Sequence, residues 1–243
     1  YLGIDVGFSA QVRSTGVCVI SPARAHPVSV RHVRTHETMA TVGQLLAGRT
    51  PRAVALDGPL VPGPKSFAVV NRYRDCERLL SGGIFQKRCK PGPTNSPRGQ
   101  ALHRQTTSLA NEIVIRYPAA TISEAFPNAF LGIMLPDKTF VRPIRRGIKS
   151  DVFWKVAVSG SGLMKRVLTH LFGAAAPQIY RECRALEDHD ERAAFVCAVT
   201  ARAAHSGRSL VVHTPLDGSI ALGPANFTQR WALAHLRERA ALA

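Results

Sequence analysis

The order of the periodic segments constrains this chain more than any other feature of its sequence. Three β-rich runs come first, joined by short polar links, which predicts an antiparallel meander. The first run alternates strictly: its large apolar residues lie on one side, and Gly3, Asp5 and Gly7 lie on the other. A helical pattern and a mostly apolar fourth strand follow, and later segments alternate between strand and helix. The expected strands cover residues 2–8, 15–21, 28–33, 52–57 and 120–125.

A meander followed by strand–helix–strand crossovers predicts an α/β fold with one mixed sheet. We expect five strands in the order 3-2-1-4-5 with helices on both faces, which is the ribonuclease H-like topology. One domain should cover residues 1–243, with a basic loop-and-helix insertion at 58–118 between strands 4 and 5. The expected helices cover residues 38–48, 71–80, 100–116, 149–172, 190–205 and 228–242, and a further short strand covers 210–213.

The composition is typical of a folded protein that meets polyanions. The chain has 243 residues, of which 45% are hydrophobic and 20% charged, and this excludes wholesale disorder. It carries 32 Lys and Arg against 16 Asp and Glu, a formal net charge of +16. Such a field attracts nucleic acid and speeds its association. General over-use of arginine would give the same balance, so charge alone identifies no site.

The cysteine pattern and the apolar runs favour a reduced, cytoplasmic protein. Five cysteines without a C-x-x-C pair argue against a disulfide framework and against a zinc knuckle. No apolar run reaches the roughly 20 residues of a membrane span. The first residues also lack the pattern of a signal peptide. We therefore expect no membrane association.

Three carboxylates occupy strand positions where apolar residues are expected. Asp5 lies within the first strand between two glycines, Asp57 ends the fourth strand, and Glu124 ends the fifth. An acidic group that includes Asp188 and Asp190 begins a helix rich in small residues. The proposed topology brings these strand ends and the helix start to one sheet edge. Converging carboxylates repel one another, and hard oxygen ligands select Mg²⁺ or Mn²⁺.

Two such ions would position a water and stabilise the leaving oxygen of a phosphodiester. The expected metal ligands are Asp5, Asp57 and Asp190, and either Glu124 or Asp188 assists them. Each acid except Asp5 has a structural alternative. Asp57 precedes a Gly-Pro turn signal, Asp188 or Asp190 could cap the helix, and Glu124 could pair with an arginine.

Six motifs follow one another in an order that is informative as a set: GIDVGF, STGVCVI, VALDGPL, RYRDCE, ISEAFP and HDERAAFVCAVTA. This set resembles the DUF429 family, a group described as predicted ribonuclease H-like nucleases. The resemblance covers about residues 2 to 204. It implies a ribonuclease H-like fold in which Asp5, Asp57 and an acid of the last helix hold metal, with Glu124 near them.

One position departs from the pattern of that family. An aspartate usually precedes the alanine of the final stretch, whereas Ala193 stands there in this chain. Asp190 lies three residues earlier on nearly the same helix face and could take the ligand role. The alternative is that the site is weakened.

Basic residues are frequent in the insertion, where they could follow a phosphate backbone. A solvated charged loop is the alternative. The resemblance implies that Arg74 contacts a phosphate or pairs internally with Asp75. The residues expected to contact nucleic acid are Arg74, Lys87, Arg88, Lys90 and Arg98.

Two groups of histidines have both structural and functional explanations. His189, beside the acidic group, could shuttle a proton for an attacking water, or simply face solvent. His26, His32 and His36 cluster near the third strand, where surface or partly buried positions are the commoner explanation and zinc is the alternative.

The sequence therefore favours a divalent-metal-dependent nuclease that hydrolyses phosphodiester bonds of DNA or RNA. A noncatalytic nucleic-acid-binding protein on the same fold is the first alternative, motivated by Ala193 and the charge of +16. An actin-like nucleotide-dependent phosphotransferase is the second, because Asp5-Val6-Gly7 resembles the first phosphate loop of that group. The nuclease requires Mg²⁺ or Mn²⁺, the binder is indifferent to chelation, and the phosphotransferase binds Mg·ATP.

Overall fold

The computed structural model describes residues 1–9, 11–61, 73–141, 144–145, 148–215 and 217–240. These residues form a mixed α/β fold around one sheet with the strand order β3-β2-β1-β4-β5-β7-β6. The strands are β1 (Leu2–Asp5), β2 (Thr15–Ile20), β3 (Val28–Val33), β4 (Ala53–Asp57), β5 (Thr121–Ala125), β6 (Ser209–Thr214) and β7 (Gly218–Pro224).

The expected order 3-2-1-4-5 is present, but the expected total of five strands is wrong because the sheet has seven. The strands β1, β2 and β3 form the antiparallel meander, and β1, β4 and β5 run parallel. The β6–β7 hairpin extends the sheet beyond β5, and β7 pairs with β5 only at Glu124–Ile220 and Ala125–Ala221. The sequence predicted a short strand at 210–213 but not its position in the sheet order. The sequence prediction missed β7 because glycine and proline flank its short apolar run.

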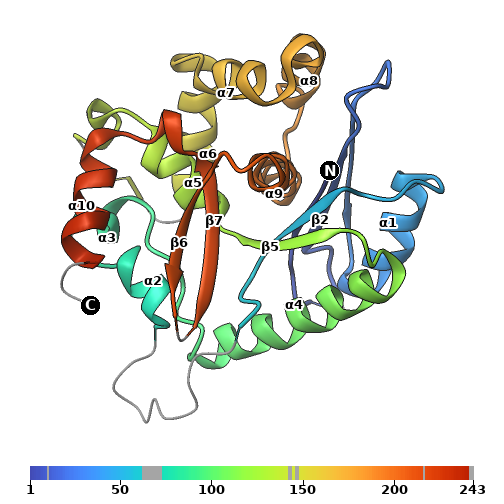
Figure 1. The fold of residues 1–243 in the computed structure, drawn as a ribbon, viewed down its shortest axis with the longest axis horizontal. Coiled ribbons are helices and arrows are strands. Elements are labelled where there is room, and N and C mark those ends of the chain that lie inside the picture. Colours follow the sequence, from blue (N-terminus) through green and yellow to red (C-terminus); the bar gives the residue numbers. More distant parts are fainter. Residues whose placement is uncertain (10, 62–72, 142–143, 146–147, 216, 241–243) are drawn as a thin grey trace.

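The helices lie on both faces of the sheet (Figure 1). They are α1 (Thr38–Leu46), α2 (Asp75–Leu79), α3 (Ile84–Arg88), α4 (Pro97–Arg116), α5 (Pro127–Met134), α6 (Lys149–Lys155), α7 (Leu163–Phe172), α8 (Ala176–Cys183), α9 (His189–His205) and α10 (Arg230–Ala240). The expected helix over 149–172 is interrupted by a π-helical turn at Val156–Gly160 and by Gly162, whose φ is +60°. The part of the insertion over residues 62–72 lies outside the described residues.

Strand alternation decides what each face of the sheet carries. Leu2 and Ile4 of β1 and Val54 and Leu56 of β4 pack in one hydrophobic cluster with residues of α1 and α4. The residues between them therefore face the opposite side, against α9. This parity places Gly3, Asp5 and Asp57 on the α9 face.

Two glycines allow α9 to lie unusually close to the sheet. A Cβ on Gly3 would lie 2.1 Å from the Ala198 nitrogen and 2.2 Å from the Ala194 oxygen. A Cβ on Gly16 would lie 2.0 Å from the backbone carbonyl oxygen of Asp190. Because α9 presents small residues here, its backbone sits against the strands, and its first turn is held beside the end of β1.

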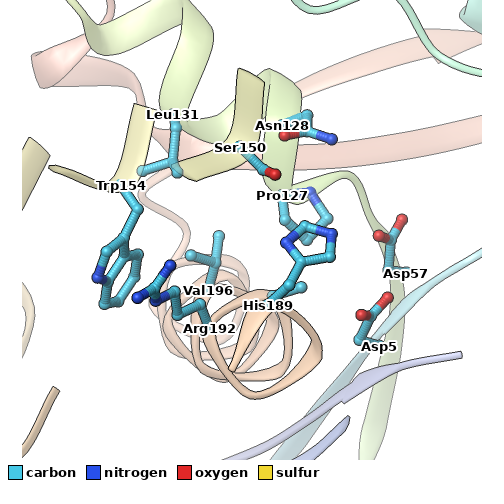
Figure 2. Close-up of a pocket in the computed structure, with 11 residues that line it drawn as sticks. Asp5, Asp57, Pro127, Asn128, Leu131, Ser150, Trp154, His189, Arg192 and Val196 are labelled. Atoms are coloured by element: carbon cyan, nitrogen blue, oxygen red, sulfur yellow. The ribbon is translucent and has the colours of Figure 1, made fainter. Parts of the chain in front are cut away.

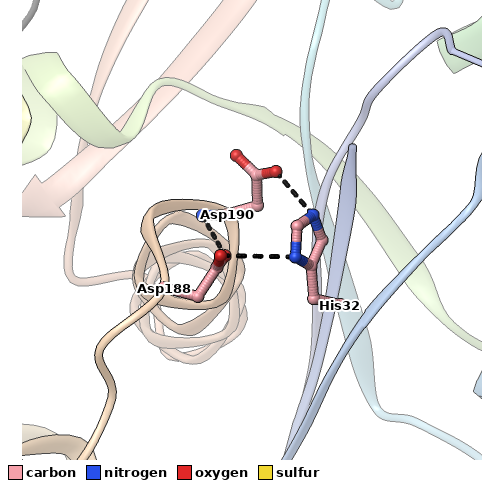
Figure 3. A group of neighbouring side chains, drawn as sticks. All are labelled: His32, Asp188 and Asp190. Carbon is pink, nitrogen blue, oxygen red and sulfur yellow. Dashed lines mark hydrogen bonds and ion pairs between the residues drawn. The ribbon is translucent and has the colours of Figure 1, made fainter. Parts of the chain in front are cut away.

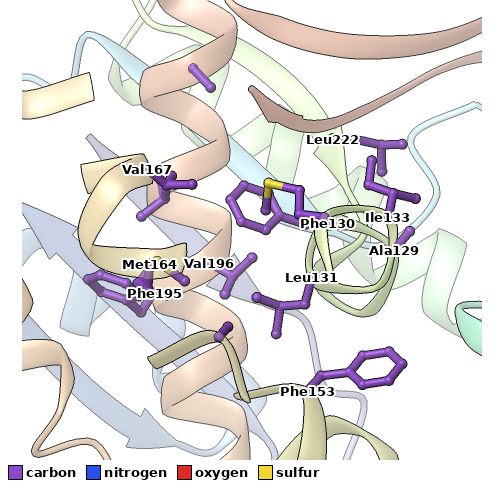
Figure 4. Close-up of a cluster of buried hydrophobic side chains, with 14 of the residues drawn as sticks. Ala129, Phe130, Leu131, Ile133, Phe153, Met164, Val167, Phe195, Val196 and Leu222 are labelled. Atoms are coloured by element: carbon purple, nitrogen blue, oxygen red, sulfur yellow. The ribbon is translucent and has the colours of Figure 1, made fainter. Parts of the chain in front are cut away.

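A second layer of helices covers the outer side of α9. Phe130 and Leu131 of α5, Met164 of α7 and Phe195 and Val196 of α9 belong to one buried cluster (Figure 4). This cluster fixes α9 between the sheet and α5–α7 (Figure 1). The result is a rigid platform for the side chains at the start of α9.

All five cysteines are buried, and none is in a disulfide. Within the described residues, no helix combines the length and the apolar character that crossing a membrane requires.

Candidate metal centre

Asp5 and Asp57 lie side by side at the ends of two neighbouring parallel strands. They are direct partners in the β1–β4 register, and the pleat turns both toward α9. Both are partly buried (Figure 2). The sequence prediction that these two carboxylates converge is confirmed.

Asp190, in the first turn of α9, brings a third carboxylate to the pair. Its carboxyl group and that of Asp57 both lie within hydrogen-bonding reach of Asp5, a contact in which one of the acids must hold a proton. Burial raises the pKa of Asp5 well above its usual range, and the charges of Asp57 and Asp190 raise it further. Burial also raises the pKa of Asp57 to about 7, with a smaller contribution from Glu124. The folded protein therefore holds a proton among these acids unless a cation replaces it.

None of the ion pairs among the described residues gives Asp5 or Asp57 a lysine or arginine partner. Two adjacent buried carboxylates without a cationic side chain are costly when both are ionised. A divalent cation would remove this cost, and its usual ligands are carboxylate oxygens. The donor set of this edge therefore fits Mg²⁺ or Mn²⁺.

His32 of β3 adds a nitrogen donor to the same edge (Figure 3). Its Nδ1 lies 3.3 Å from an oxygen of Asp188, and its Nε2 lies 2.8 Å from an oxygen of Asp190. One atom from each of the three residues falls within 4.8 Å of the others, as ligands of one ion would. The other oxygen of Asp188 accepts from the backbone N–H groups of Asp190 and Glu191. Asp188 is thus the α9 N-cap, which was the structural alternative for it.

A small cavity of about 40 Å³ opens beside Asp5 and Asp57. His189 and Ala193 line it from successive turns of α9, and Asn128 lines it from the start of α5 (Figure 2). The volume suits a water molecule or a cation rather than an organic substrate. Ala193 therefore occupies a position from which an aspartate would have reached the cavity.

Glu124 does not face α9 with the three aspartates, although its charge contributes to the raised pKa of Asp57, and its expected catalytic role stays a prediction. In the β4–β5 register, Glu124 pairs with Leu56, whereas Ala125 is level with Asp57. One residue along a strand reverses the face, so Glu124 points to the side opposite Asp57. Its two oxygens accept from Arg74, and one also accepts from the Leu60 N–H at 3.0 Å.

The phosphate contact expected for Arg74 is wrong because this side chain is buried in ion pairs. Arg74 is 1% exposed, and its guanidinium is bound to both Glu124 and Glu77. The suggested internal pairing with Asp75 is also wrong, because Asp75 pairs with Arg78. Arg74 instead joins the insertion to β5, and the buried Asp217 of the β6–β7 hairpin binds the backbone N–H groups that begin α2.

The other basic residues of the insertion divide into internal and exposed groups. Arg88 pairs with Asp137 at 2.7 Å and lies over the rings of Phe140 and Trp231, which corrects its expected role in nucleic-acid contact. Lys90 and Arg98 are exposed and stay candidates for that role. The side chain of Lys87 lies outside the described part of the chain.

A second, larger cavity shares Asp57 with the small one. It is a groove of about 560 Å³ between the ends of β4 and β5, the loop before α4, and the first turn of α4. Phe8 and Arg98 line it together with Asp57. Its volume falls in the range of roughly 300–1,000 Å³ that small-molecule sites occupy.

The sequence grouped His32 with His26 and His36, as surface residues or zinc ligands, and missed its place beside Asp188 and Asp190. The signal was present in the alternation of β3, where Val28, Val30 and His32 share one face. Val28 and Val30 pack in the cluster that contains α9. A histidine at the end of that face lies next to the start of α9, beside its acids.

Comparison of the chain with protein-family models, with curated proteins and with solved structures found no match. The geometry of the edge is therefore the basis for any functional conclusion.

Proposed function

We propose that the chain is a divalent-metal-dependent nuclease with a ribonuclease H-like core, as its resemblance to the DUF429 family implies. The observation that carries the proposal is the register pairing of Asp5 with Asp57 and the contact of Asp190 with Asp5. Two further features support it: the net charge of +16, which suits a polyanionic substrate, and the groove that reaches Asp57.

Asp5, Asp57 and Asp190 would hold the cation, and Asp188 and His32 extend the donor set beside them. An imidazole nitrogen suits Mn²⁺ better than Mg²⁺, which prefers oxygen donors alone. We therefore infer that Mn²⁺ is the better of the two ions. Glutamine in place of His32 should reduce the preference for Mn²⁺ over Mg²⁺ more than it reduces binding of Mg²⁺.

The reaction is hydrolysis: water adds to phosphorus, the bond from phosphorus to the leaving oxygen breaks, and the released alcohol takes up a proton. A bound divalent cation supplies an acidified water and neutralises developing charge. The aspartates fix the geometry of the site on two rigid strands and one helix. His189, which is exposed and lines the small cavity, would accept a proton there.

Calorimetric titration with Mn²⁺ tests the metal site without any choice of substrate. We expect saturable binding by the wild type, loss of binding by Asp5→Asn, and no change in Glu112→Gln, a matched substitution of an exposed acid on α4. Labelled DNA and RNA oligonucleotides with Mn²⁺, and then with EDTA, test the activity. A wild type that neither binds Mn²⁺ nor cleaves any oligonucleotide contradicts the proposal.

A noncatalytic nucleic-acid-binding protein on the same fold is the second candidate. Ala193 favours it, because the small cavity has an alanine where a further ligand would fit. Its signature is salt-dependent binding of DNA or RNA that EDTA does not alter. For the third candidate, the phosphotransferase, the test is calorimetry with Mg·ATP, and a flat titration removes it.

A further inference from the structure

The groove beside Asp57 has an exposed aromatic ring on one wall. Phe8 is 57% exposed, although Val6, two residues earlier, is 6% exposed and part of the core. Single exposed apolar residues are common, so exposure alone carries no conclusion. The ring of Phe8, however, lines a groove that also reaches Asp57, and this position points to a ligand.

The backbone on both sides of Phe8 is anchored. The N–H of Gly7 donates to Thr15 Oγ1 at 3.1 Å, and the N–H of Ser9 donates to Ser14 Oγ at 3.3 Å. Gly7 also lies so close to Ser14 that a Cβ there would be 2.0 Å from the Ser14 oxygen. The ring is therefore presented from a fixed support, which reduces the entropy lost when a flat ligand binds to it.

The groove also has a cation in its lining. Glu77 and Glu124 line it as well, but both carboxylates are paired with the buried Arg74. Arg98 is exposed in the first turn of α4, a helix of 20 residues, and it lines the groove. Lys90 is exposed next to Pro91, which lines the groove as well. An anion in the groove would pair with Arg98, and a metal ion held by Asp57 would attract it as well.

We propose that this groove binds single-stranded nucleic acid, with a base stacked on Phe8 and the neighbouring phosphate directed past Arg98 toward Asp57. An exposed ring and a cation in one groove match the two parts of a nucleotide, its flat base and its phosphate. A base within a duplex is stacked on both of its faces, so it cannot stack on Phe8 without leaving the helix. The inference rests on the proposed nuclease function and names the substrate class of that site.

Fluorescence anisotropy with a labelled eight-nucleotide single strand, in EDTA and at fixed salt, measures the stacking contact. Phe8→Leu keeps an apolar side chain but removes the ring, and we expect its affinity to fall about tenfold. Phe8→Trp keeps a flat ring and should retain wild-type affinity. The second probe is an abasic strand of the same length, which has phosphates but no bases. Phe8→Leu should bind it as tightly as the wild type does.

A blunt duplex of the same sequence is the third probe, and it should bind the wild type more weakly than the single strand does. Arg98→Gln should weaken binding of every probe and reduce the slope of log affinity against log salt by about one. Equal affinity of Phe8→Leu and wild type for the single strand overturns the inference, as does equal affinity of the wild type for strand and duplex.

Calorimetry with Mn²⁺ separates failure of this inference from failure of the proposed function. Phe8 lies outside the donor set, so Phe8→Leu should bind Mn²⁺ as the wild type does. If the wild type cleaves single strands and Phe8→Leu cleaves them with unchanged KM, the nuclease stands and the stacking contact is wrong. If the wild type binds single strands through Phe8 but neither binds Mn²⁺ nor cleaves, the nuclease is wrong and the groove still recognises a base.

Discussion

Asparagine in place of Asp57 should stabilise the metal-free protein at alkaline pH. Asparagine keeps the shape of the side chain and removes its charge. Burial, with a smaller contribution from Glu124, raises the pKa of Asp57 from 3.8 to about 7, so the ionised form is disfavoured in the folded state. Asp57 also faces Asp5 directly across the β1–β4 pair. Removing one charge of this pair relieves the repulsion that raises the pKa of Asp5.

The sign of the pH dependence follows from the raised pKa. Folded and unfolded chains are both protonated below the unfolded value, and there the charge of Asp57 costs nothing. As the pH rises from about 4 to about 7, the unfolded chain releases this proton more readily, and the folded state loses stability. Each tenfold difference in proton affinity corresponds to about 1.4 kcal/mol, so the full shift corresponds to about 4 kcal/mol. Because Asp57 is only partly buried, we expect a gain of about 1–3 kcal/mol from Asp57→Asn at pH 8.

Urea denaturation at pH 5 and pH 8, in EDTA and in Mn²⁺, measures this effect. In EDTA, Asp57→Asn should exceed the wild type in stability at pH 8, and by less at pH 5. In Mn²⁺ at 100 times its dissociation constant, the wild type should gain about 2.7 kcal/mol and the variant should not. Glu112→Gln is the control and should follow the wild type in all four conditions. A variant that is less stable than the wild type at pH 8 in EDTA would refute the argument.

Three further substitutions test other parts of the site. Ala193→Asp should place an additional carboxylate in the small cavity, raising the affinity for Mn²⁺ in calorimetry and lowering the metal-free stability at pH 8. Arg74→Met leaves Glu77 and Glu124 buried without their cation and should cost about 3–5 kcal/mol in urea denaturation; a change below 1 kcal/mol would show that the network is dispensable. Gly3→Ala forces a Cβ against the backbone of α9 and should cost about 3 kcal/mol and abolish Mn²⁺ binding, whereas Gly92→Ala, where a Cβ meets open space, should change neither.

Local alternation was sufficient to predict the two central carboxylates. The side chains of β1 and β4 repeat every two residues, so the sequence alone shows that Asp5 lies opposite Leu2 and Ile4 on the strand. The same pattern shows that Asp57 lies opposite Val54 and Leu56. Because neighbouring parallel strands place their carboxyl ends at one edge of a sheet, strand order and alternation together predict that these two aspartates converge.

Register between strands could not be predicted in the same way. Glu124 and Asp57 both end their strands in the sequence, yet the β4–β5 pairing is offset by one residue. Such an offset is decided by the packing of both faces and moves a side chain to the other side of the sheet. The local sign was that Ile122 and Glu124, two residues apart, share one face of β5, and Ile122 packs in the cluster that includes α1 and α4.

The two cavities that meet at Asp57 make the competing functions distinguishable at one residue. A nuclease uses Asp57 to hold a cation that attracts the phosphate, so Asp57→Asn should weaken nucleic-acid binding in Mn²⁺ relative to the wild type. In a noncatalytic binder, the same carboxylate only repels phosphate across the groove that it lines. Asp57→Asn should then strengthen binding, equally in Mn²⁺ and in EDTA. The direction of this single change therefore separates the two functions, whichever nucleic acid is the natural partner.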